Sequence, residues 1–132
     1  MKVLSLTEPF ATLIKEKKKL VETRSWKTNY RGELYIHASL TKIPKSSLER
    51  KELMSLVEDK EMNFGYIICK CKLVDCLYMT KEYVENMKKS NQQEYICGEY
   101  EEGRYAWILE DIEPLEEKIK IKGHLGVWNY EE

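Results

Sequence analysis

The longest β-type pattern of the chain, residues 64–78, constrains its fold most strongly. These fifteen residues are rich in aliphatic and aromatic side chains and contain no proline. A usual strand has ~5–6 residues, so a run of this length cannot stay flat within a small sheet. We therefore expect this strand to bend or bulge, as the strands of β-barrels do.

Shorter elements surround this run. Alternating patterns predict further strands at 3–6, 20–26, 33–39, 104–112 and 118–122. Helices are predicted to begin at Thr7–Pro9, at Pro44 and at Thr80, and residues 90–103 are expected to form a loop. The glycine-rich turns of a nucleotide-binding parallel sheet are missing. We therefore predict an α+β fold, a small mixed β-barrel of five to six strands flanked by about three helices.

Composition limits the class of protein. The chain has 132 residues, of which 42% are hydrophobic, enough for a single domain spanning residues 1–132. Its formal net charge is −1, so any site for nucleic acid must be a local basic patch. No apolar run approaches the ~18 residues of a membrane span, and the N-terminus has no signal-peptide pattern. We expect a cytoplasmic monomer that has no cofactor and does not contact a membrane.

The four cysteines of the chain are Cys69, Cys71, Cys76 and Cys97. Cys69 and Cys71 are two positions apart in a strand pattern, a spacing that differs from the C-x2-C knuckle of structural zinc. His37 and His124 are the available histidine ligands, and neither belongs to a paired motif. The pattern favours free cysteines in the core of a reduced protein over a metal or redox site.

Charge is concentrated in a segment that otherwise has a strand pattern, Lys19-Leu20-Val21-Glu22-Thr23-Arg24-Ser25-Trp26. Glu22 and Arg24 share one face of such a strand and can form an ion pair. Charged side chains that face a barrel interior are costly unless they are paired or functional, so an inward pair would indicate a site. A solvated outward face is the alternative, because Val21 would then face the core. The alternation alone does not decide between the two.

Several blocks of the sequence resemble, in the correct order, the ASCH domain family. The first joins Ser5-Leu6-x-x-Pro9-x-Ala11-x-x-Ile14 to Lys19-x-x-Glu22-x-Arg24-x-Trp26. The later blocks are Arg31-Gly32-x-Leu34-x-Ile36-His37-Ala38-Ser39, Tyr105-Ala106-Trp107-Ile108-Leu109 and Gly123-x-x-Gly126-x-Trp128. The match covers nearly the whole chain, from Met1 to about Trp128.

The resemblance implies a PUA-like barrel with a cleft where Lys19, Glu22 and Arg24 gather. The family is associated with RNA binding, with transcriptional coactivators and, in one branch, with hydrolysis of N4-acetylcytidine. That branch uses a lysine and a threonine of this segment and a distant glutamate. Lys19 matches the lysine, but Glu22 stands at the threonine position, Thr23 is expected to face away, and the distant glutamate has no identified match. Lys17 also replaces the family's glycine two residues before the lysine.

The residues expected to bind a ligand are Ser5, Pro9, Lys19, Glu22, Arg24, Trp26, Arg31, His37, Ser39, Tyr105 and Trp107. Lys19 and Glu22 are also the candidate catalytic residues, as a nucleophile or base and as a general acid or base, and no metal ligand is assigned. Arg24 can hold a phosphate through two hydrogen bonds, and the aromatic side chains can stack on bases. The alternatives are an Arg24 that only orients Glu22, a structural His37 and a Trp107 that belongs to the core.

Three functions follow from this interpretation. The first is binding in the cleft of RNA, of a nucleoside with or without a modification, or of a nucleotide. This function involves no chemical reaction. The second is a small hydrolase at the same cleft, either of the N4-acetylcytidine amidohydrolase type or a ribonuclease. The third is an interaction domain in transcription, which ranks last because the chain has no further segment to recruit partners. The sequence indicates no particular protein partner.

Overall fold

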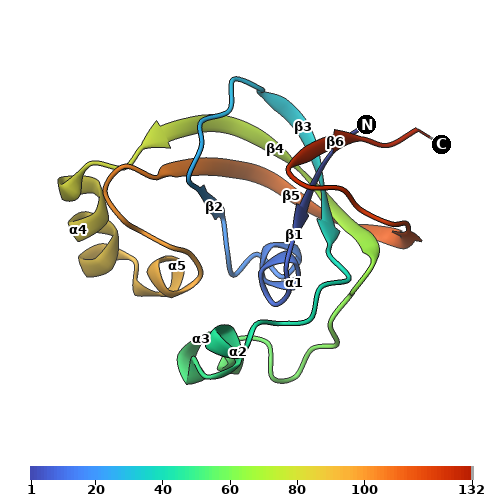
Figure 1. The fold of residues 1–132 in the computed structure, drawn as a ribbon, viewed down its shortest axis with the longest axis horizontal. Coiled ribbons are helices and arrows are strands. Elements are labelled where there is room, and N and C mark those ends of the chain that lie inside the picture. The colour runs from blue at the N-terminus through green and yellow to red at the C-terminus, as the bar shows by residue number, and fades with distance from the viewer. Residues whose placement is uncertain (132) are drawn as a thin grey trace.

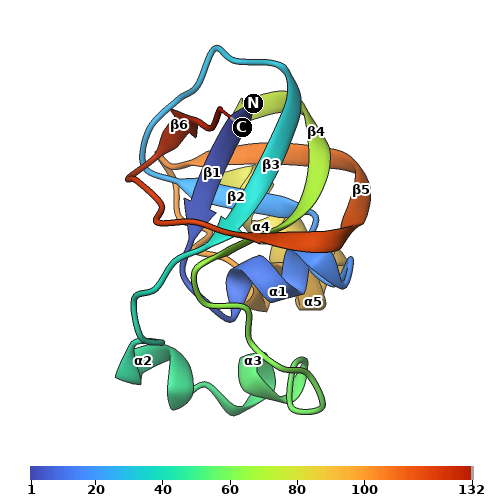
Figure 2. The same ribbon diagram turned by 90° about the vertical axis from the view of Figure 1, so that its right-hand side faces the viewer.

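The computed structural model describes residues 1–131, which form one sheet of six strands and five short helices. The strands are β1 (Lys2–Leu6), β2 (Val21–Arg24), β3 (Gly32–Ala38), β4 (Tyr66–Tyr78), β5 (Tyr105–Lys120) and β6 (Val127–Asn129). The helices are α1 (Phe10–Lys15), α2 (Lys45–Leu48), α3 (Lys51–Ser55), α4 (Lys81–Ser90) and α5 (Gln92–Ile96). The sheet curls into a half-barrel, with α1 across one end (Figures 1 and 2). The predicted α+β class is confirmed, and the curled six-stranded sheet is consistent with the expected PUA-like barrel.

Strand β4 is the long strand that the sequence predicted, and it follows the curl of the sheet (Figure 2). It pairs antiparallel with β3 on one side and with β5 on the other. Its register with β5 shifts between Ile67 and Cys69, between Lys70 and Lys72, and between Leu73 and Asp75. Such irregularities bend a strand and increase its twist, so a single strand of 13 residues can curve with the barrel.

Strand β5 differs from the prediction. The two strands expected at 104–112 and 118–122 form one strand of 16 residues. Its pairing with β4 runs from Tyr105 opposite Tyr78 to Lys120 opposite Tyr66, so the whole length of β4 provides partners for it. Asp111, with a φ of 52°, lies within one of the register shifts, where a strand accommodates backbone angles that a regular ladder excludes.

The helices are shorter and more numerous than the predicted three. Arg50 has an extended backbone and separates α2 from α3, and the expected loop at 90–103 contains α5. At α4 the predicted cap is confirmed, because Thr80 Oγ1 accepts a hydrogen bond from the Tyr83 N–H at 3.1 Å. Asn91 Oδ1 accepts in the same way from the Glu94 N–H at 3.2 Å. This cap explains how a polar segment begins a helix.

Helix α1 ends just before the lysine run. Lys17 adopts the left-handed conformation with a φ of 61°. Its turn lets the N–H groups of Lys18 and Lys19 both donate to the Leu13 carbonyl, at 2.9 and 3.1 Å. Glycine, which the family resemblance led us to expect at this position, adopts such a conformation without strain. The turn also directs the side chain of Lys19 into the protein, where only 1% of its surface is exposed.

The main hydrophobic core lies between the curled sheet and α1. Trp107 is its largest fully buried side chain. Cys69, Cys71 and Cys76 belong to this core, and Cys97 packs in a second cluster with residues of α1 and α3. All four cysteines are free and buried, and burial raises the pKa of the Cys97 thiol to about 11. The prediction of core cysteines is therefore confirmed.

None of the helices within residues 1–131 is long and apolar enough to cross a membrane.

Candidate functional site

A cleft of about 1030 Å³ opens where the curl of the sheet brings β2 toward β1. The strand order is β2-β5-β4-β3-β1-β6, so β2 is an edge strand. Side chains of β1, β2 and β3 line the cleft together with residues of α1 and of the segments 39–50, 97–104 and 122–126. Segments that are far apart in the sequence therefore share this one cavity.

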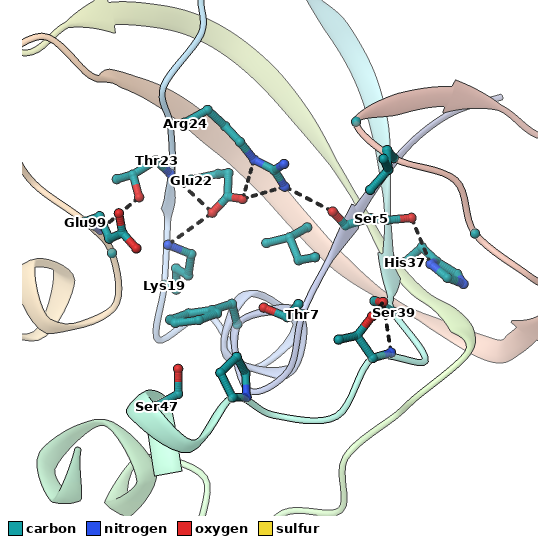
Figure 3. Close-up of a pocket in the computed structure, with 18 of the residues that line it drawn as sticks. Ser5, Thr7, Lys19, Glu22, Thr23, Arg24, His37, Ser39, Ser47 and Glu99 are labelled. Atoms are coloured by element: carbon teal, nitrogen blue, oxygen red, sulfur yellow. Dashed lines mark hydrogen bonds and ion pairs between the residues drawn. The ribbon is translucent and has the colours of Figure 1, made fainter. Parts of the chain in front are cut away.

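Three residues of the charged segment form a connected cluster in the cleft (Figure 3). Lys19 Nζ lies 3.4 Å from Glu22 Oε1. Glu22 Oε2 accepts a hydrogen bond from Arg24 Nε at 2.8 Å and lies 2.8 Å from Arg24 Nη2. Lys19 and Glu22 are buried, whereas Arg24 is partly exposed. One carboxylate thus faces two cations, and the alternative of a solvated outward face does not apply.

The ammonium of Lys19 makes two hydrogen bonds to the backbone and one ion pair within the protein. Besides its contact with Glu22, it donates to the carbonyl oxygens of Val21 at 2.7 Å and of Cys97 at 2.6 Å. An ammonium has three donors and no acceptor, so at least two of its N–H groups are engaged by the backbone. Lys19 therefore joins β2 to the segment that follows α5.

Charged side chains also satisfy the free edge of β2. The Leu20 carbonyl faces β5, where it accepts from the Leu109 N–H at 3.0 Å, so Val21 and Thr23 direct their backbone groups away from the sheet. Four contacts meet these groups: Glu94 with the Val21 N–H (3.2 Å), Lys19 with the Val21 carbonyl (2.7 Å), Glu22 with the Thr23 N–H (3.2 Å) and Arg104 with the Thr23 carbonyl (3.4 Å). They occupy the positions that a neighbouring strand would take.

Glu94 is a site residue that the sequence did not identify. It is 4% exposed, and its carboxylate also accepts a hydrogen bond from the Leu20 N–H at 2.8 Å. Burial raises the pKa of Glu94, while the two backbone N–H groups and the charge of Lys19 oppose that rise. We refer to Lys19, Glu22, Arg24 and Glu94 as the β2 cluster. The sequence offered one indication of such a residue. The resemblance to the N4-acetylcytidine-hydrolysing branch implied a distant glutamate, for which no match was identified.

Ser5 connects the β2 cluster to the opposite wall of the cleft. Its carbonyl oxygen accepts from Arg24 Nη2 at 3.0 Å. His37 Nε2 lies 2.8 Å from the Ile121 carbonyl and therefore carries the proton, so Nδ1 accepts from the Ser5 hydroxyl at 3.0 Å. Trp128 Nε1 donates to the same hydroxyl at 2.9 Å. Burial lowers the pKa of His37, which favours its neutral form.

Gly123 packs directly on the Ser5–His37 pair. A Cβ at this position would lie 2.4 Å from His37 Cε1 and 2.6 Å from Ser5 Oγ, closer than real atoms approach. Glycine is therefore required for the loop 122–126 to cross the ends of β1 and β3. The close approach gives a physical reason for the first glycine of the closing sequence block.

The charge of the cleft differs from that of the whole chain. Its lining includes five cationic side chains, Lys19, Arg24, Arg50, Arg104 and Lys122, and two carboxylates, Glu22 and Glu99. The formal charge of the cleft is therefore +3, while the chain as a whole carries −1. Positive charge gathered in a concavity attracts anions over and above any single contact.

Six of the eleven residues expected to bind a ligand line this cleft: Ser5, Lys19, Glu22, Arg24, His37 and Ser39. Thr23, expected to face away, also lines it, because the cleft reaches the edge of β2 and not only one of its faces. Lys122 also lies in the lining, whereas Lys118 Nζ donates to Asn63 Oδ1 at 3.3 Å.

The remaining five residues lie outside the lining: Pro9, Trp26, Arg31, Tyr105 and Trp107. Trp107 is fully buried, and its ring meets that of Trp26 edge-on at 4.8 Å. Arg31 lies 3.8 Å from Asp75 on another part of the surface. Tyr105 packs against Tyr78, with ring centroids 5.7 Å apart. The sequence blocks thus mix cleft residues with residues that build the barrel.

Comparison with known proteins identifies the family of the chain. The ASCH domain matches residues 4–119 of the chain. This protein belongs to the ASCH domain family. The family is generally associated with RNA binding.

Two curated relatives of this ASCH domain are the proteins named activating signal cointegrator 1 of Homo sapiens and of Mus musculus. They are 28% and 27% identical to it over 132 residues, which include 95% of this chain. The chain spans 21% of their length. The similarity therefore concerns one part of those proteins.

Two crystal structures of ASCH from Zymomonas mobilis, one of them a point mutant, share this fold. Each aligns with a TM-score of 0.56 and 20% sequence identity over 90% of the present chain. The alignment covers 72% of one and 74% of the other. At this level of identity the likeness supports the barrel and its topology.

Proposed function

We propose that this ASCH domain binds RNA in the cleft between β1 and β2, through contacts between its cationic side chains and phosphate groups. The observation that carries the proposal is the formal charge of +3 in a cavity of about 1030 Å³ on a chain of net charge −1. Contacts to phosphate supply much of the affinity of proteins for nucleic acids. Because the chain as a whole is nearly neutral, a site for nucleic acid has to be a local basic patch of this kind.

Arg24 is the residue best prepared for such a contact. Glu22 holds its Nε and Nη2 groups, and the Ser5 carbonyl also accepts from Nη2. Among the described residues, Nη1 has no hydrogen-bond partner, so its two N–H groups remain for a ligand. A guanidinium fixed in advance loses little conformational entropy when it binds a phosphate.

The test is a titration of a short fluorescent single-stranded RNA, read by anisotropy at low and at moderate salt. Arg24→Gln and Arg104→Gln should each weaken binding about 5- to 20-fold, because each removes a charged donor from the cleft. Arg31→Gln is the matched control, since it removes the same charge outside the cleft. The proposal fails if the wild-type domain binds no RNA at low salt, or if Arg31→Gln weakens binding as much as the cleft variants do.

Hydrolysis of an acylated nucleoside such as N4-acetylcytidine is a second candidate. It is favoured by the position of Glu94 near Lys19 and by Thr23 in the lining of the cleft, which together supply the residue types of the amidohydrolase branch. The two backbone hydrogen bonds and the ion pair that hold the Lys19 ammonium oppose a role as nucleophile. Incubation with N4-acetylcytidine, followed by chromatography, tests this candidate. Turnover that is abolished by Thr23→Val would support this candidate. If the wild-type domain released no cytidine, the candidate would be excluded.

A further inference from the structure

The two most exposed large hydrophobic side chains of the described chain, Leu125 and Leu40, both line the cleft. Leu125 is 99% exposed and Leu40 is 65% exposed. The next in order, Leu48 and Tyr78, are each 53% exposed and lie outside the lining. Single exposed leucines are common on protein surfaces and need no explanation. Two exposed leucines at the same cationic cavity do require an explanation. We refer to Leu40 and Leu125 as the leucine pair.

The loop that carries Leu125 is held in place at both ends. Before it, the Ile121 N–H donates to the Gly65 carbonyl at 3.0 Å, and Gly123 packs on the Ser5–His37 pair. After it, the Gly126 carbonyl accepts from the Ser5 N–H at 3.5 Å. These contacts fix the path of the loop while leaving Leu125 entirely in solvent.

Leu40 is positioned by a turn of its own. The Ser39 hydroxyl accepts from the Thr41 N–H at 3.1 Å and donates to Thr41 Oγ1 at 3.0 Å, which closes a tight turn around Leu40. One side of Leu40 packs against Gly65, where an added Cβ would lie 2.9 Å from its Cδ2. Gly65 also anchors the loop of Leu125, so one backbone position supports both members of the leucine pair.

We infer that the leucine pair contacts unpaired bases of the RNA whose phosphates bind the cationic side chains of the same cleft. This inference rests on the proposed function and adds a substrate class to it, single-stranded RNA with at least one unstacked base. An unpaired base offers an apolar face directly beside a charged backbone, whereas a duplex hides those faces in its stack. The cleft presents the complementary combination, because the leucine pair lines the same cavity as Arg24, Arg104 and Lys122.

The experiment measures the affinity of three probes of equal length: a single-stranded RNA, the same RNA in a duplex, and an abasic oligonucleotide that has the phosphates but no bases. The variants are Leu125→Asn and Leu40→Asn, which keep a similar size and remove the apolar surface, and Leu125→Phe, which retains it. Leu48→Asn is the matched control, an exposed leucine outside the cleft.

The inference predicts that Leu125→Asn and Leu40→Asn each weaken binding of the single-stranded RNA about 5- to 10-fold, as expected for partial loss of a leucine contact. Binding of the abasic probe should change less than about twofold, and Leu125→Phe and Leu48→Asn should bind the RNA like the wild type. The wild type should also prefer the single strand to the duplex.

Two results would overturn the inference while leaving RNA binding intact. One is an unchanged affinity of both asparagine variants for the single strand, and the other is an equal loss for the abasic probe. If the wild type bound none of the three probes, the proposed function itself would fail, so the two failures are distinguishable.

Discussion

Three members of the β2 cluster, Lys19, Glu22 and Arg24, line the same cleft as the leucine pair, yet the two groups differ in almost every physical respect. The side chains of the cluster are largely buried and hydrogen-bonded to one another and to the edge of β2. The leucines are exposed, and their contacts with the protein only hold their loops in place. The comparison teaches that residues in one cavity can serve different purposes. Most of the cluster maintains the shape of the cleft, and the leucines are free to meet a ligand.

This difference has a consequence for mutagenesis. Substitutions in the cluster should mainly change the free energy of unfolding, because they leave buried groups without partners. Substitutions of the leucine pair should leave stability unchanged and alter binding alone. Arg24 lies between the two cases, since it is held by the cluster and is partly exposed to the cleft.

The largest effect is expected for Lys19→Met, which tests whether the cluster is structural. The change leaves the carbonyls of Val21 and Cys97 without the donor Lys19 and removes one of the two cations that face Glu22. Breaking a buried ion pair in this way typically costs about 3–5 kcal/mol, and we expect a loss of that size in urea denaturation. Lys122→Met is the control, because Lys122 is an exposed lysine of the same cleft and should change stability by less than about 0.5 kcal/mol. A loss below about 1 kcal/mol for Lys19→Met would remove the contrast between the two regions.

A smaller loss is expected for Gly123→Ala, at the point where the loop of Leu125 packs on the barrel. The added methyl group would collide with His37 and Ser5, and overpacking of this kind costs about 1–3 kcal/mol. Thermal or urea denaturation measures the effect. The double variant Gly123→Ala with His37→Ala provides the check, because space freed at residue 37 should make the two effects less than additive. Strict additivity would show that the predicted collision is not the cause.

A pH effect is expected from His37, which links the two regions through Ser5. Because burial holds the pKa of His37 below its ordinary value of 6.5, the unfolded chain binds this proton at a higher pH than the folded protein does. This contribution to stability is therefore present above about pH 6.5 and is lost as the pH falls toward the folded pKa. His37→Gln should make the fall in unfolding free energy between about pH 7 and about pH 5 shallower. Parallel curves for the two proteins would contradict this assignment.

The smallest expected effect is an increase in stability. Lys17→Gly should raise the free energy of unfolding by about 1 kcal/mol, because Lys17 has a left-handed backbone that glycine adopts without strain. Lys15→Gly, the same substitution two residues earlier within α1, should instead lower it by about 1 kcal/mol. Denaturation of both variants tests whether the turn before the cluster is strained. A loss of stability in both would contradict it.

The sequence predicted those parts of the molecule that depend on local patterns. The length of β4 and the Thr80 cap followed from short segments, whereas a cleft at Lys19, Glu22 and Arg24 was implied by the family resemblance and left open by the local pattern. Glu94 was missed because its role depends on the backbone of residues 20 and 21, more than 70 positions away. Its helix, α5, was missed because a single Asn91 cap outweighs the polar character of the segment.

The leucine pair was also beyond prediction, for a different reason. A leucine in a loop next to strands is normally assigned to the core, and its exposure here depends on anchoring contacts at Gly65, Ser5 and His37. The division of β5 into two expected strands failed similarly, because only the long partner β4 makes the continuous pairing possible. Contacts between distant segments decided each of these cases.

Methyl NMR of the wild-type domain, titrated with a short single-stranded RNA, tests the central claim most directly. Binding in the cleft predicts chemical-shift changes at the methyl groups of Leu40 and Leu125 and at the side-chain Nε–H of Arg24. Ile68 and Leu115, which lie away from the cleft beside a second, smaller cavity, should remain unchanged. Shifts confined to Ile68 and Leu115, with none at the leucine pair or at Arg24, would contradict the account.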